Sequence, residues 1–167
     1  MNRTVGCPTR ATQTGHRHSG PPKLALAVQY ATNDAALPAR AQVRRWVRAA
    51  QEMDATVTIR FVGAIEGRTI NAEFRGKDCA TNVLTFVYDD GSPRAGDIVL
   101  CAPIVRQEAA TQGKPLAAHY THLVVHGMLH LQGYAHERDA DAAPMEARET
   151  AILARLGLPD PYGVAAT

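Results

Sequence analysis

Long apolar runs are missing from this chain. Of its 167 residues, 46% are hydrophobic, yet no uninterrupted apolar stretch approaches the ~20 residues that a membrane-spanning helix needs. No charged stretch followed by an apolar core and a small-residue cleavage site stands near the N-terminus, which argues against a secretory signal. We therefore expect a soluble protein that has no membrane partner.

Cysteine is also scarce. Cys7, Cys79 and Cys101 are far apart and form no CxxC pair. The sequence therefore predicts neither a disulfide framework nor a zinc site made of thiolates. This cysteine usage is typical of a reducing compartment, and we expect the protein in the cytoplasm.

Acidic residues are nearly absent from the first fifty positions. Residues 1–50 contain eight Lys and Arg but a single acid, Asp34, whereas the rest of the chain has ten Lys and Arg against fifteen Asp and Glu. A basic end on a chain with a formal net charge of +2 is compatible with a polyanionic partner. It is equally compatible with a solvated, arginine-rich surface.

The length of the chain suits one domain with a single core. Residues 1–22 are rich in Thr, Gly, Ser and Pro and show no helical or strand periodicity, so we predict a disordered N-terminal extension there. The single domain is expected over residues 23–160 and a C-terminal tail over 161–167. No internal repeat is visible.

Hydrophobic periodicity predicts four strands and about five helices. The expected strands cover residues 23–31, 56–63, 82–90 and 96–102. The expected helices cover residues 39–52, 68–76, 103–113, 116–133 and 144–156. The last two strands flank the turn-forming segment DDGSPRAG and should pair as a hairpin. Helices packed on a sheet of four strands make the fold class α/β or α+β.

Capping residues predict where the helices begin and end. Thr69 is expected to cap the second helix and Gly76 to stop it. Pro144 should open the last helix, because proline fits the first helical turn. The helix over 116–133 is apolar almost all round, which predicts that it is buried.

The segment HGMLHLQGYAH, residues 126–136, places three histidines in apolar surroundings. His126 and His130 lie one helical turn apart on the same face, close enough to share a metal ion. Gly133 can adopt the left-handed conformation that turns the chain back, so His136 can return to the same point. Core histidines bonded to backbone carbonyls are the alternative, which this spacing disfavours.

Three neutral imidazoles with a fourth position left for water are typical of catalytic rather than structural zinc. Zinc lowers the pKa of its bound water from near 16 to roughly 7 and polarises an oxygen of the scissile bond. His119 and His122 lie on nearly the same helical stripe as His126. A pair of His122 and His126 has no turned-back third ligand, so we expect His122 to orient a ligand or to bind the substrate.

The pattern HxxxHxxGxxH also matches the zinc ligands of metzincin peptidases. Where those enzymes have the glutamate that acts as general base, this chain has Gly127, which cannot move a proton. Either another acid supplies the base, for which Glu137, Asp139 and Asp97 are candidates, or the reaction is not peptide hydrolysis.

The segment LVVHGMLHLQGYAHERD resembles the hallmark HGxLHLxGYDH of the YbeY family of bacterial rRNA maturation factors. FRGKDCATNVLTFVYDD and AGDIVLC resemble the family's upstream blocks, RxxDxPTNVLSFP followed by LGDI. The resemblance covers about residues 24–158. The chain departs from the pattern at Ala135, where the family usually has Asp, and at Thr85, Val87 and Asp90. Without that Asp, the support of the third histidine is open.

The resemblance implies a small mixed sheet packed with helices, with the zinc site on a buried helix and the loop after it. It also implies a single-strand-specific, zinc-dependent endoribonuclease that acts in 16S rRNA 3′-end maturation and ribosome quality control. One Zn²⁺ per chain would be held by His126, His130 and His136, and Arg75 falls at the family's functionally important arginine. The implied partners are single-stranded rRNA, the small ribosomal subunit and its assembly factors.

An RNA substrate gives Arg75 a physical role. Its guanidinium can donate two parallel hydrogen bonds to a phosphate and stabilise the negative charge that grows during phosphoryl transfer. Pairing with Asp78 or Glu73 is the alternative. Base stacking is less evident, because only 5% of the residues are aromatic; the nearest candidates are Phe74, Phe86, Tyr88 and Tyr134.

Four arginines on the helix over 39–52 could follow an RNA backbone electrostatically, or could form an exposed basic face without a partner: Arg40, Arg44, Arg45 and Arg48. Two other functions also stay open. One is a zinc peptidase with a non-standard general base. The other is a non-catalytic ribosome-assembly factor in which zinc only joins the buried helix to the following loop.

Overall fold

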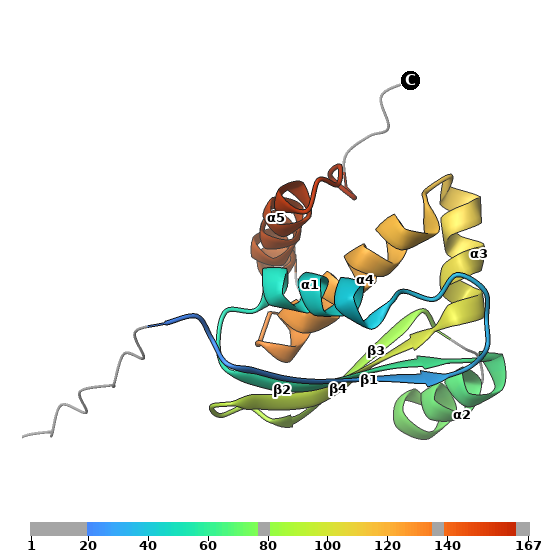
Figure 1. Cartoon of the computed structure of the whole chain (residues 1–167), viewed down its shortest axis with the longest axis horizontal. Coiled ribbons are helices and arrows are strands. Elements are labelled where there is room, and N and C mark those ends of the chain that lie inside the picture. Colours follow the sequence, from blue (N-terminus) through green and yellow to red (C-terminus); the bar gives the residue numbers. More distant parts are fainter. Residues whose placement is uncertain (1–19, 77–80, 135–138, 163–167) are drawn as a thin grey trace, which may run out of the picture.

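A computed structural model describes residues 20–76, 81–134 and 139–162. In chain order its elements are β1 (Leu24–Ala31), α1 (Arg40–Ala50), β2 (Ala55–Val62), α2 (Ala64–Arg75), β3 (Val83–Asp89), β4 (Arg94–Cys101), α3 (Ala102–Gln112), α4 (Leu116–Leu131) and α5 (Asp139–Arg155). The sheet lies between α2 on one face and α1, α4 and α5 on the other (Figure 1). We call these the α2 face and the α4 face.

The four strands form one mixed sheet in the order β1-β2-β4-β3. β1 pairs with β2 and β2 with β4 in parallel, whereas β3 and β4 are antiparallel. The predicted hairpin and the small mixed four-stranded sheet with five helices are therefore confirmed. β1 and β3 are the two edge strands.

Side chains of each strand alternate between the two faces, as the period of two requires. On the α4 face, Ile59 and Phe61 of β2 and Ile98 and Leu100 of β4 are buried in the main core with α1, α4 and α5. The α2 face has a smaller core, made by Val62, Leu84, Val99 and Cys101. The α4 helix lies in the main core, and ten of its sixteen residues are buried, which confirms the prediction from its apolar surface.

Two predicted helix starts are wrong. α2 begins five residues before Thr69, whose hydroxyl donates to the carbonyl of Ile65 inside the helix. The sequence does not predict this first turn, because Gly67 lies in it and glycine disfavours helix formation. Packing requires it there: a Cβ at this position would lie 2.9 Å from Sγ of Cys101.

α5 begins at Asp139 and contains Pro144. Pro144 has no N–H to donate to the carbonyl of residue 140, so α5 lacks one backbone hydrogen bond there but continues on both sides of the proline. The predicted stop of α2 is confirmed, since Gly76 adopts the left-handed conformation with φ 68°.

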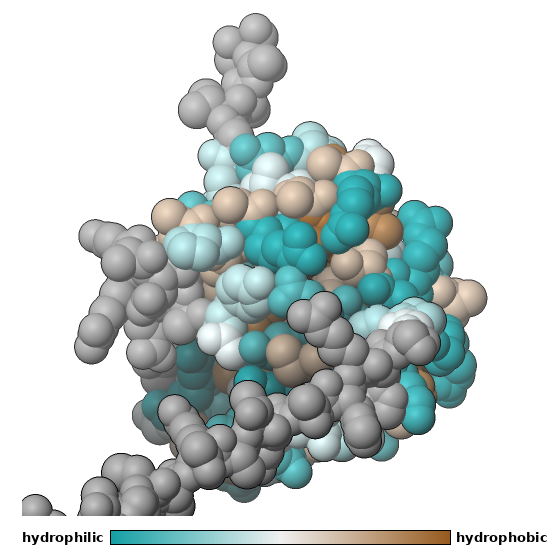
Figure 2. Space-filling model, turned by 90° about the vertical axis from the view of Figure 1, so that its left-hand side faces the viewer, coloured by the Kyte–Doolittle hydropathy of each residue, from teal (hydrophilic) through white to brown (hydrophobic). Residues whose placement is uncertain are grey.

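The surface at the left of Figure 1 is mostly hydrophilic, with small apolar patches between the polar side chains (Figure 2). Among the described residues, no helix has both the length and the apolar character needed to cross a bilayer. Most of the predicted N-terminal extension, residues 1–19, lies outside the described residues.

Candidate functional site

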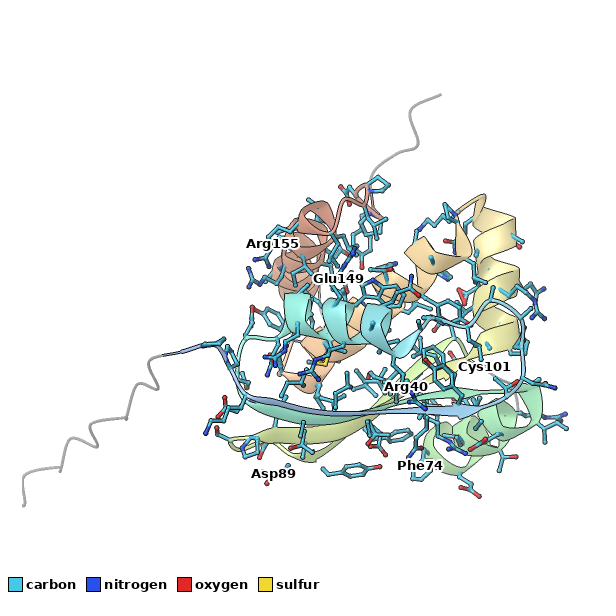
Figure 3. The ribbon with its side chains drawn as sticks, viewed as in Figure 1. Arg40, Phe74, Asp89, Cys101, Glu149 and Arg155 are labelled. Atoms are coloured by element: carbon cyan, nitrogen blue, oxygen red, sulfur yellow. The ribbon has the colours of Figure 1, made fainter. Side chains whose placement is uncertain are left out.

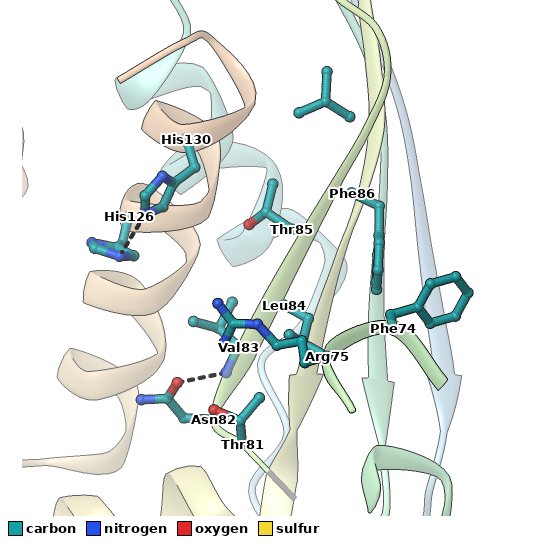
Figure 4. Close-up of a pocket in the computed structure, with 11 residues that line it drawn as sticks. Phe74, Arg75, Thr81, Asn82, Val83, Leu84, Thr85, Phe86, His126 and His130 are labelled. Atoms are coloured by element: carbon teal, nitrogen blue, oxygen red, sulfur yellow. Dashed lines mark hydrogen bonds between the residues drawn. The ribbon is translucent and has the colours of Figure 1, made fainter. Parts of the chain in front are cut away.

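A cleft of about 570 Å³ lies between the free edge of β3 and helix α4. His126 and His130 line it from α4, and Arg75 lines it from the last turn of α2. In Figure 4 the Arg75 guanidinium extends past β3 towards α4. Three of the four residues predicted for the site therefore share one cleft; the fourth, His136, lies outside the described residues.

The two histidine rings point their Nε2 atoms at each other. These atoms are 3.0 Å apart. The opposite ring nitrogens are held by other groups: Nδ1 of His130 lies 3.0 Å from the carbonyl oxygen of Tyr134, and Nδ1 of His126 contacts the carboxylate of Glu149. One helical turn of spacing thus brings both rings to one point, as predicted from the sequence.

The partners of Nδ1 determine where the ring protons lie. A carbonyl and a carboxylate only accept hydrogen bonds, so each Nδ1 carries the hydrogen and each Nε2 presents a lone pair. Two lone pairs 3.0 Å apart repel each other unless one ring carries a second proton and donates an N–H···N hydrogen bond, or a metal ion lies between them. Two nitrogen ligands of a tetrahedral zinc ion, each about 2.0–2.1 Å from the metal, are about 3.3 Å apart. The donor pair therefore fits a metal ion.

Glu149 of α5 is fully buried beside these histidines, between α5 and α4 (Figure 3). Its carboxylate accepts hydrogen bonds from Nε2 of His122, at 3.1 Å, from Nδ1 of His126 and from the hydroxyl of Tyr162. Burial alone would raise the pKa of Glu149, but hydrogen bonds from His122, His126 and Tyr162, together with the electrostatic attraction of His126, outweigh burial and lower the pKa to about 2. The group is therefore a carboxylate at neutral pH, whereas burial and the bond to Glu149 raise the pKa of Tyr162.

His122, His126 and Glu149 form a second set of donors that could hold a metal ion. One donor atom from each lies within 4.8 Å of the others. His126 belongs to both arrangements, because its Nε2 faces His130 and its Nδ1 faces Glu149. A metal ion at this His-His-Glu group would have to displace the hydrogen bonds that Glu149 accepts.

Sequence reasoning missed Glu149 and Tyr162. A signal for Glu149 was present: it shares the apolar stripe of its helix with Met145, Ile152 and Leu153, all of them buried. A carboxylate at a core position needs hydrogen-bond donors around it. Which side chains donate to Glu149 depends on how α5 packs on α4. The spacing of residues within α5 does not predict this packing.

Gly127 has a packing role that explains the missing glutamate. A Cβ at this position would lie 2.9 Å from Cγ2 and 3.1 Å from Cδ1 of Ile98, so a larger side chain has no room. Asp97 is wrong as a substitute base. Its neighbour Ile98 packs towards α4, so Asp97 points to the α2 face, where it accepts a hydrogen bond from Tyr88 at 2.7 Å.

The arginines of α1 lie at the other edge of the sheet. Arg40 donates to the carbonyl of Val28 in β1 and stacks over the ring of Tyr30, and Arg48 donates to the carbonyl of Pro22. None of them lines the cleft beside β3. Arg40 and Arg48 thus join β1 and the segment before it to α1. This favours the alternative in which the basic face has no RNA partner.

Arg75 differs from those arginines because it lines the cleft. None of the ion pairs formed among the described residues includes it. Its predicted alternative partner Glu73 does not pair with it there, and Asp78 lies outside the described residues.

Comparison with known proteins identifies relatives of this chain. A family model described as Endoribonuclease YbeY matches residues 28–157. A protein of Aromatoleum aromaticum named Endoribonuclease YbeY is 57% identical over 143 residues, which cover 84% of this chain and 93% of that protein. A protein of the same name from Nitrosomonas europaea is 57% identical over 140 residues, covering 84% and 85% of the two chains.

Among solved structures, the fold is similar to the solution structure of TM1509 from Thermotoga maritima. The TM-score is 0.56 at 24% sequence identity, and the match covers 83% of this chain and 99% of that one. At this level of identity the likeness concerns the fold alone.

Proposed function

The chain belongs to the YbeY endoribonuclease family and is, like the rest of that family, a metal-dependent hydrolase of RNA. From this premise we propose which residues of the cleft bind the metal ion and the RNA. His126, His130 and His136 hold one zinc ion per chain. Arg75 binds the scissile phosphate of a single-stranded RNA. The proposal rests on one observation: Arg75 and the imidazoles of His126 and His130 line the same cleft. Arg75 belongs to α2 on one side of the sheet, and the two histidines belong to α4 on the other (Figure 1).

The facing Nε2 atoms support the choice of metal ligands. Both lone pairs are directed to one point by acceptors on the far side of each ring, and imidazole nitrogen is a preferred ligand of zinc. The ion would supply a hydroxide at neutral pH and polarise an oxygen of the phosphate. Glu149 holds the ring of His126 in the tautomer that leaves Nε2 for the metal.

The guanidinium of Arg75 would bind two oxygens of the scissile phosphate through parallel hydrogen bonds. Charge grows on these oxygens as the phosphodiester is cleaved, so a fixed cation lowers the barrier. A peptide bond would use the metal ion but not this arginine. The close contact of Gly127 with Ile98 also leaves no space for the general base of a metzincin, which disfavours the peptidase alternative.

The biological role follows the family. We infer that the substrate is the 3′ end of 16S rRNA, that the enzyme takes part in ribosome quality control, and that it meets the small ribosomal subunit and its assembly factors in the cytoplasm. The acting unit would be the single domain over residues 23–160, with an extension before it and a tail after it.

The test compares His130→Ala and Arg75→Ala with Arg44→Ala, an arginine outside the cleft. Zinc is measured by elemental analysis of the purified proteins, and cleavage on a single-stranded rRNA fragment and on its duplex. We expect His130→Ala to lose both zinc and cleavage. Arg75→Ala should keep zinc and cleave about 100-fold more slowly, and Arg44→Ala should match wild type.

Unchanged cleavage by metal-free wild-type protein would overturn the metal-dependent mechanism. If instead no RNA is cleaved in vitro while Arg75→Ala still binds the ribosome and matures rRNA normally, the non-catalytic assembly role is correct.

A further inference from the structure

The cleft is not confined to the α4 face. Side chains of β3 alternate, so Val83 packs in the core of the α4 face and Leu84 and Phe86 in the core of the α2 face. Thr85, between them, points towards α4 in Figure 4. Residues of β3 that point to the α4 face and residues that point to the α2 face line the same cleft. The cleft therefore continues around the free edge of β3 from one face of the sheet to the other.

Two aromatic rings form the end of the cleft on the α2 face. Phe74 and Phe86 both line it, with ring centroids 4.8 Å apart and an interplanar angle of 63°. Phe74 is 64% exposed, although phenylalanine is among the residues most often buried. Its edge-to-face contact with Phe86 fixes the orientation of the Phe74 ring. The exposed ring therefore presents an apolar surface to the cleft.

Phe74 and Arg75 are consecutive residues that lie on different sides of the strand edge. The guanidinium of Arg75 extends towards α4 and the histidines, whereas the ring of Phe74 lies on the opposite side of β3 (Figure 4). Figure 3 likewise places Phe74 on the side of the sheet that carries α2. A strand that crosses the edge of β3 with one phosphate at Arg75 would thus bring a neighbouring nucleotide to Phe74.

We propose that Phe74, supported by Phe86, is a nucleobase-binding subsite that stacks an unpaired base next to the scissile phosphate. The inference rests on the proposed function, since Arg75 fixes the phosphate from which the base is counted. An unpaired base can unstack from its neighbours and stack on a protein ring, whereas a paired base must first break its pairing. The subsite therefore gives the enzyme a physical reason to prefer single-stranded RNA.

The continuity of the cleft favours a nucleobase over an apolar peptide as the occupant. The same hollow holds an arginine and two imidazoles, which suit a polyanion, and the aromatic pair begins where these polar groups end. Tyr88, also exposed, follows Phe86 on the same face of β3, with its hydroxyl bonded to Asp97 at 2.7 Å.

The experiment uses the full-length, zinc-loaded protein and a set of single-stranded oligoribonucleotides in which one abasic residue is moved along the strand. Phe74→Ala and Phe74→Trp are compared with wild type. Ile65→Ala is the matched control, because Ile65 is 86% exposed in the first turn of the same helix and does not line the cleft. Thermal unfolding confirms that each variant is folded.

On the intact strand we expect Phe74→Ala to raise KM about tenfold, with kcat changed less than about threefold. Phe74→Trp and Ile65→Ala should match wild type. With the abasic residue at one particular position beside the cleavage site, wild type should show the same raised KM, and Phe74→Ala should raise it no further.

A tenfold rise in KM that is equal for intact and abasic strands would overturn the subsite, and so would an unchanged KM in Phe74→Ala. An effect on kcat alone would also contradict it. His130→Ala separates the two proposals. If that variant cleaves RNA like wild type, the proposed function has failed; if it is inactive while Phe74→Ala behaves like wild type, only the base subsite is wrong.

Discussion

At the scale of single residues, Glu149 determines which nitrogen of His126 is left to bind a metal ion. The buried carboxylate of Glu149 takes the Nδ1 hydrogen, and Nε2 is left facing His130. Glu149 is held in turn by His122 and by Tyr162. Metal affinity should therefore depend on a residue that is not a ligand in the proposed site.

Replacing Glu149 by Gln is the test at this scale. The amide keeps the shape of the carboxylate, but its NH2 group brings donors towards His122 and Tyr162. Its remaining oxygen is uncharged and accepts the Nδ1 hydrogen of His126 more weakly. We expect zinc affinity to fall about 10- to 100-fold, measured by competition with a coloured chelator. Glu146→Gln, on an exposed position of the same helix, should change nothing.

His122→Ala decides which side of His126 binds the ion. In the proposed site this variant keeps all three ligands, so zinc affinity should fall far less than in His130→Ala. If His122→Ala loses the metal as completely as His130→Ala does, the ion is bound instead by His122, His126 and Glu149.

At the scale of elements, we expect the C-terminal end of α2 to position Arg75. Gly76 ends α2 directly after this arginine, and Gly113 ends α3; both have left-handed φ angles, 68° and 64°, and open space where a Cβ would stand. Alanine at either position strains the backbone by a similar amount. The two glycines therefore form a matched pair.

We expect Gly76→Ala and Gly113→Ala each to lower the free energy of unfolding by about 1 kcal/mol, measured by urea denaturation. Only Gly76→Ala should also slow RNA cleavage, because the strain adjoins Arg75, the proposed phosphate-binding residue. Equal cleavage by the two variants would show that the end of α2 does not position Arg75.

The elements were predictable wherever local pattern and tertiary packing agree. The alternating β2 and the apolar α4 show their burial in the sequence itself, and the spacing of His126 and His130 is a property of one helix. Gly67 breaks the local pattern, since it is required by Cys101 of another element. Glu149 was missed for the same reason: its histidine partners come from α4, a helix packed against its own.

At the scale of the whole molecule, the core itself makes stability depend on pH. Burial raises the pKa of Tyr120 to about 12, so the folded state favours the neutral phenol. This contribution is complete below about pH 10, the ordinary pKa of the group, and is lost as the pH rises from about 10 to about 12. The loss is at most about 3 kcal/mol.

Tyr120→Phe tests this dependence through urea denaturation between about pH 8 and 12. Below pH 10 the variant should be about as stable as wild type, because the ring still fills the same place in the core. Above pH 10 its stability should fall less steeply. The slope should not vanish, because the pKa values of Tyr88, Tyr134 and Tyr162 are raised as well. Identical slopes for the two proteins would contradict the assignment to Tyr120.

The carboxylate that orients His126 has a consequence for biosynthesis. Translation runs from the N-terminus, so Phe74, Arg75 and the α4 histidines leave the ribosome before Glu149 and Tyr162 do. A growing chain that has reached only α4 carries His126 without the carboxylate that orients its ring. In the proposed site, the metal centre would therefore be completed late in translation, while the ribosome and its RNA are still close to the chain.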